Sequence, residues 1–183
     1  MAFNPTLPLD GSLMVAAEMR DQFNGLAALI DAQAALTPYG RVAADWTSSS
    51  ASFTNVTGLA FNVAAGESWT AELVLYAIGG ASLQGLKFRV AGPGAASVLI
   101  SMQGTGPGAS STSMDCEVQT AFSVASPAKT FCTGSNLTGV VRVHVVVTNA
   151  SAAGSVQLQA SNSSGSGTVT IKANSDVVAR KTG

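Results

Sequence analysis

The fold class is decided by the stretch from Thr138 to Lys181, TGVVRVHVVVTNASAAGSVQLQASNSSGSGTVTIKANSDVVARK. Four valines in its first part alternate with polar or mixed residues: Val141, Val143, Val145 and Val147. Because the side chains of a strand point alternately to its two faces, these valines share one apolar face, opposite Arg142 and His144. The alternation returns at Val156–Ala160 and Val169–Ile171, after segments rich in turn-forming residues. The stretch therefore predicts consecutive strands with one buried face.

Short alternating or apolar runs continue back to Asp45, and turn signals such as Thr57-Gly58 and Gly79-Gly80 separate them. No helical periodicity interrupts the strands, which argues against a parallel α/β sheet. We expect a mainly β fold, an antiparallel β-sandwich or jelly-roll-like domain over residues 45–183.

An extended arm and one helix are expected before the β domain. Two prolines keep Met1–Leu9 extended, Asp10 or Ser12 can cap a helix, and the helix runs to about Ala35, before Pro38. Residues 1–36 therefore form an arm-and-helix segment, and residues 37–44 are interpreted as a linker. Four apolar residues at heptad-like spacing form a seam on the helix: Met19, Phe23, Leu26 and Ile30. This seam either packs on the chain's own domain or serves self-association.

The composition narrows the possible partners. Charged residues make up only 10% of the chain and apolar residues 46%, so we expect part of the surface to be covered by a partner or by other copies. A net charge of −1 offers no basic field for nucleic acid or anionic lipid. We read no signal peptide and no membrane-spanning run, and expect synthesis in the cytoplasm.

The few residues that could carry chemistry form no convincing site. Cys116 and Cys132 are interpreted as buried, reduced thiols, and a single histidine is too few for a typical zinc site. His144 is expected to face solvent or a subunit contact. Asp115 and Glu117, two residues apart, could act on a glycoside, but an exposed polar edge is the preferred interpretation. We expect no catalytic residue, cofactor or metal site, and no enzymatic activity.

Aromatic residues leave a sugar-binding alternative open. Trp46, Trp69, Tyr39 and Tyr76 could form a stacking platform, although they are scattered in the sequence, and Trp69 begins a strand where core packing is commoner. The loop Gly104–Ser113 could also take part in binding a glycan.

Three segments resemble virion proteins of tailed bacteriophages. The opening FNPTLPLDGSLMVAAEMRDQFNGLAALIDA, with its core at Met19–Leu26, resembles the N-terminus of fibre and tail proteins. The segments Phe53–Ala77 and Gly154–Lys181 resemble trimeric head-fibre or capsid-decoration domains. No likeness extends to Gly104–Ser113 or to the region from Cys116 to Cys132.

The resemblance implies a function that the residues alone do not give. It implies a non-enzymatic structural protein of the virion, a homotrimer that attaches to capsid, collar or tail proteins through its arm and helix. The alternative is a receptor-binding module of a tail fibre that recognises glycans on the host surface. Neither alternative involves nucleic acid, a membrane or a cofactor.

Overall fold

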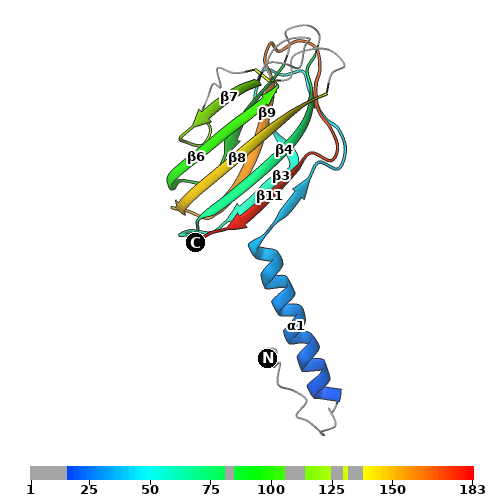
Figure 1. Cartoon of the computed structure of the whole chain (residues 1–183), viewed down its shortest axis with the longest axis vertical. Coiled ribbons are helices and arrows are strands. Elements are labelled where there is room, and N and C mark those ends of the chain that lie inside the picture. The colour runs from blue at the N-terminus through cyan, green and yellow to red at the C-terminus, as the bar shows by residue number, and fades with distance from the viewer. Residues whose placement is uncertain (1–15, 81–84, 106–113, 125–129, 132–137) are drawn as a thin grey trace. The chain divides into compact units, whose positions relative to one another are not determined.

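The computed structural model describes residues 16–80, 85–105, 114–124, 130–131 and 138–183 (Figure 1). The chain divides into two units, Met1–Pro38 and Tyr39–Gly183. The expected class is confirmed, because the second unit is mainly antiparallel β and one α-helix precedes it.

The helix of the first unit is α1 (Ala16–Leu36). It ends where the sequence predicts, two residues before Pro38, whose ring disfavours a helical conformation at the preceding residue. The predicted start at Asp10 or Ser12 lies outside the described residues.

The larger sheet of the second unit contains eight described strands, all in antiparallel pairs. Its main path, in spatial order, is β1 (Tyr39–Arg41), β11 (Asp176–Lys181), β4 (Trp69–Ile78), β8 (Thr138–Ala150), β6 (Ala95–Thr105) and β7 (Met114–Gln119). Beside this path, β10 (Val169–Ile171) pairs with both β4 and β2 (Trp46–Ser48). The first and last strands of the unit, β1 and β11, are therefore neighbours.

The smaller sheet contains three described strands. Their order is β3 (Thr54–Val63), β9 (Gly154–Asn162) and β5 (Leu86–Ala91). Buried residues of both sheets form a single hydrophobic core, so the two sheets are the layers of a β-sandwich. The jelly-roll form of the prediction is not confirmed by the order of the described strands.

Strand β8 supplies the centre of the core. Its alternate valines at 141, 143, 145 and 147 are at most 1% exposed, as the sequence predicts. β8 is hydrogen-bonded to β4 on one side and to β6 on the other, so both of its edges are satisfied (Figure 1). Facing side chains from the smaller sheet, including Phe88 and Leu158, are fully buried against this layer.

The segment 37–44 is only partly a linker. Residues Tyr39–Arg41 form the edge strand β1, which pairs with β11. Just beyond it, the Val42 amide donates to the carbonyl of Ser175, and the Asn174 amide donates to the carbonyl of Val42. The β unit therefore begins at Tyr39 and not at Asp45, because backbone pairing to a strand distant in sequence holds these residues.

The predicted turn at Thr57-Gly58 is wrong. β3 continues through these residues with a bulge, where its register against β9 shifts between Asn55 and Ala60. The side-chain amide of Gln157 donates to the carbonyls of Val56 and Leu59 beside the bulge, at 2.9 and 3.0 Å. Glycine is required at position 58 because its φ is +90° and a Cβ there would lie 2.2 Å from the Arg41 carbonyl oxygen.

We expect Val143→Asp to lower the free energy of unfolding by at least about 3 kcal/mol, because an unpaired carboxylate would enter the core. Val140→Asp is the matched control, since Val140 is 39% exposed on the opposite face of the same strand. Urea unfolding monitored by circular dichroism measures both variants. Equal destabilisation of the two variants would show that the inward face of β8 is misassigned.

We also expect Gly58→Ala to destabilise the protein by about 2 kcal/mol or more, through a positive φ combined with a backbone clash. Gly66→Ala separates the two causes, because Gly66 has a φ of +81° and no atom lies within 4 Å of the place its Cβ would take. That control should cost about 1 kcal/mol in the same urea titration. A Gly58 variant no worse than the control would mean that the bulge accommodates a side chain.

Candidate functional site

The seam predicted on α1 is solvent-exposed in this chain. The exposed fractions are 45% for Met19, 64% for Phe23, 42% for Leu26 and 60% for Ile30. Gly25 is the one buried residue in the helix. A helix with a row of large apolar side chains in water is typical of a contact surface for another molecule, because leaving this area exposed is unfavourable.

The outer face of the larger sheet also carries apolar side chains. Large residues at least 39% exposed lie on this face: Tyr39, Tyr76, Leu99, Met114, Val118, Val140 and Val178. Near its centre, Thr70, Glu72, His144, Val178 and Arg180 line a shallow depression of about 270 Å³. The predicted histidine is thus half-buried in this face, with Nε2 lying 3.4 Å from the Thr70 hydroxyl.

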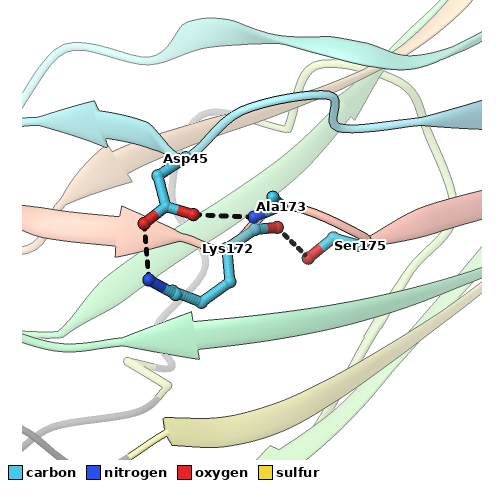
Figure 2. Close-up of polar contacts among 4 residues, drawn as sticks. All are labelled: Asp45, Lys172, Ala173 and Ser175. Carbon is cyan, nitrogen blue, oxygen red and sulfur yellow. Dashed lines mark hydrogen bonds and ion pairs between the residues drawn. The ribbon is translucent and has the colours of Figure 1, made fainter.

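A first polar cluster ties the chain near the start of the β unit to its last turn. Figure 2 shows the Asp45 carboxylate bridging two groups of the β10–β11 connection. It forms an ion pair with Lys172 and accepts a 2.8 Å hydrogen bond from the Ala173 amide. The Lys172 hydrogen bond, helped by the Ala173 amide, lowers the pKa of Asp45. Ser175 closes the same turn by donating to the Lys172 carbonyl at 2.9 Å.

A second cluster is centred on Glu67, in the turn between β3 and β4. One carboxylate oxygen accepts from the Ala64 amide at 2.8 Å and from the Trp69 indole at 2.9 Å. The other accepts from Lys181 at 2.7 Å, at the end of β11. These donors, Lys181 first, lower the pKa of Glu67 to about 2. Both carboxylates hold turns and strand ends in place, so their role is structural.

A third cluster crosses the outer face of the smaller sheet. Asn55, Gln159 and Arg89 stand side by side on β3, β9 and β5. The Arg89 Nε–H donates to the Gln159 side-chain oxygen at 2.5 Å, and the Gln159 amide donates to the Asn55 side-chain oxygen at 2.7 Å. The guanidinium carbon of Arg89 lies 4.6 Å from the centre of the Phe53 ring. The sequence did not reveal this row, because the register of three strands brings it together.

Three of the residues that the sequence analysis considered for chemistry lie on β7: Asp115, Cys116 and Glu117. Cys116 has a free thiol, but it is exposed, so its predicted burial is wrong. Glu117 is half-buried on the inward face, where its Oε1 accepts from the Gln119 amide at 2.9 Å and its Oε2 has no partner among the described residues. The predicted exposed edge is thus wrong for Glu117. The side chain of Asp115 and the whole of Cys132 lie outside the described residues.

The four aromatic residues do not form one platform. Trp69 is 3% exposed and packs in the core, with its ring centre 5.9 Å from that of Phe61. Trp46 is half-buried and donates from its indole to the Asn55 carbonyl at 3.1 Å. Tyr39 and Tyr76 are exposed on separate, non-adjacent strands of the larger sheet. Most of the loop Gly104–Ser113 lies outside the described residues.

Comparison with known proteins found no matching family model and no curated protein with significant similarity. In the part of the chain that the structure describes, no three His, Cys, Asp or Glu side chains are grouped as metal ligands would be. Among the same residues, no helix has both the length and the hydropathy needed to cross a bilayer.

The hydrogen bonds of Glu67 should make the folded protein less stable at acidic pH. Because the pKa of Glu67 is about 2 in the folded chain and its ordinary value is 4.5, the unfolded chain binds more protons between these pH values. The stability contributed by Glu67 is therefore fully present above about pH 4.5 and is lost as the pH falls toward 2. Urea midpoints measured from about pH 6 to about pH 3 should fall for the parent and less steeply for Glu67→Gln.

Glu72→Gln is the matched control for this titration. Glu72 is an exposed carboxylate with no hydrogen-bond partner among the described residues, so Glu72→Gln removes the same charge without removing a hydrogen bond. If Glu67→Gln lost stability with the same slope as the parent, Glu67 would not be the group responsible.

Proposed function

We propose that this chain is a non-enzymatic structural protein of a tailed-phage virion, a homotrimeric fibre or decoration protein that attaches through its N-terminal arm and helix. The observation that carries the proposal is the exposed apolar seam on α1, with Phe23 and Ile30 at least 60% exposed. The resemblance of the opening segment and of two β segments to such virion proteins supports the assignment to the particle.

Copies of the same chain are the simplest cover for the seam. Residues at 19, 23, 26 and 30 follow the spacing by which helices pack around a common axis. Burying each seam side chain would contribute about 1.5–3 kcal/mol, in every copy. Two heptads are short for an independent coiled coil, so contacts between β units have to add to the association. The apolar outer face of the larger sheet is available for them.

Phe23→Asp should convert the trimer to monomers without unfolding the β unit, because three carboxylates would meet at the centre of the bundle. Asn24→Asp is the control, since it adds the same charge at the neighbouring exposed position off the seam. Sedimentation equilibrium reports the oligomer and circular dichroism the β signal. If the Phe23→Asp variant stayed trimeric, the β unit alone would be responsible for forming the trimer. A monomeric parent would contradict the proposal.

The place on the particle needs its own experiment. Gold-labelled antibodies against residues 39–183 should decorate intact tailed-phage particles whose genome encodes this sequence. The position of the label distinguishes capsid, collar and tail. Particles that carry no label, from a lysate that contains the protein, would remove the structural role.

A further inference from the structure

We propose that the outer face of the smaller sheet binds an acidic saccharide, with the carboxylates of the sugar on Arg89 and Lys87. This goes beyond the proposed structural role, since neither the helix nor the larger sheet takes part. The residues concerned are the row Asn55–Gln159–Arg89, its aromatic neighbour Phe53, and Lys87, which lies on the same face of β5.

The hydrogen bonds of the row fix what it offers to a ligand. The Gln159 oxygen is taken by the Arg89 Nε–H, so the Gln159 amide must point its N–H to the Asn55 oxygen. That oxygen is therefore also occupied, and the Asn55 NH₂ group has no acceptor among the described residues. The terminal nitrogens of Arg89 likewise have no partner in the described part of the chain. The groups left free at both ends of the row are hydrogen-bond donors, which match an acceptor-rich anion.

The charges on this face agree with the hydrogen bonds. The strands β3, β9 and β5 contain Lys87 and Arg89 and no Asp or Glu. The two cations are two residues apart on one strand face, about 7 Å along the strand. Phe53 and Gln159 hold the guanidinium in place, so little side-chain entropy is lost when a carboxylate binds to its free edge.

A saccharide fits this surface better than other polyanions. Side-chain amides lie beside Arg89 on the same face, at Gln159 and Asn55, and the free NH₂ group of Asn55 suits a sugar hydroxyl. The Arg89 guanidinium covers one face of the Phe53 ring, so that face is not open for stacking of a nucleic-acid base. The chain has a net charge of −1, so it offers no long-range positive field to nucleic acid. An acidic peptide adding to the edge of β5 would meet Phe131, which already pairs with the first residue of this strand.

Isothermal titration calorimetry of the full chain with hexagalacturonate tests the proposal, with maltohexaose as the neutral saccharide of equal length. Hexagalacturonate should bind at least roughly ten-fold more tightly than maltohexaose, and its affinity should fall between about 20 and about 150 mM salt, by the usual screening of ionic contacts. Absence of hexagalacturonate binding, or equal affinity for the neutral sugar, overturns the proposal.

Variants locate the binding on this face. Arg89→Gln should weaken hexagalacturonate binding about ten-fold or more. The affinity of Arg89→Lys should lie between those of Arg89→Gln and the parent, because lysine keeps the charge but lacks the paired N–H donors of the guanidinium. Lys87→Gln should also lower the affinity for hexagalacturonate. It tests the site independently if circular dichroism shows that the Arg89 variants fold poorly. Arg142→Gln is the matched control, since Arg142 is an exposed arginine on the outer face of the larger sheet.

Two results separate a saccharide site from unspecific charge. Loss of affinity in Arg142→Gln equal to that in Arg89→Gln would overturn the location. Poly-L-glutamate or an oligothymidylate that bound as tightly as hexagalacturonate, with the same dependence on Arg89, would overturn the saccharide as the ligand. Weak binding of both, beside Arg89-dependent binding of hexagalacturonate, supports the proposal.

Discussion

The burial of one face of β8 is the constraint on which the rest of the β unit depends. Val143 and its neighbours enter the core only if β4 and β6 pair with β8 in the observed register. A slip of one residue would turn Arg142 and His144 inward and leave two charged or titratable groups in an apolar layer. This penalty selects a single register for the central strands, and the outer strands then add to edges whose positions are already fixed.

Charged residues are scarce in this chain, and two of the carboxylates are used where strands end. Glu67 joins the turn before β4 to the end of β11, and Asp45 joins the segment after β1 to the turn before β11. Turn amides that lack a partner in the ladder donate readily to these anions. The sandwich layers stay together through apolar burial, while the carboxylates fix how strands near the two ends of the β unit meet.

Sequence patterns predicted the features that depend on local periodicity and missed those that depend on distant pairing. The valine face of β8 and the end of α1 follow from alternation and from Pro38. Three residues of β1 are too few to show a period, and Gly58 can indicate a turn or a bulge equally well. On β7 the alternation gives two faces without saying which is inward, so burial of Cys116 does not follow from it. The row Asn55–Gln159–Arg89 forms only when three strands pair in the observed register, and no single segment of the sequence encodes that register.

The position of β1 determines how mechanical load enters the protein. A pull on α1 reaches the β unit first at Tyr39, so the three residue pairs between β1 and β11 take the tension. The close approach of Gly40 to the Gly58 carbonyl and the backbone bonds of Val42 lie directly behind them. Failure of this short edge would release β1 while β4, β8 and β6 kept their pairing. A pull on α1 would therefore separate the three pairs of β1 with β11 before it loaded the ten pairs of β4 with β8.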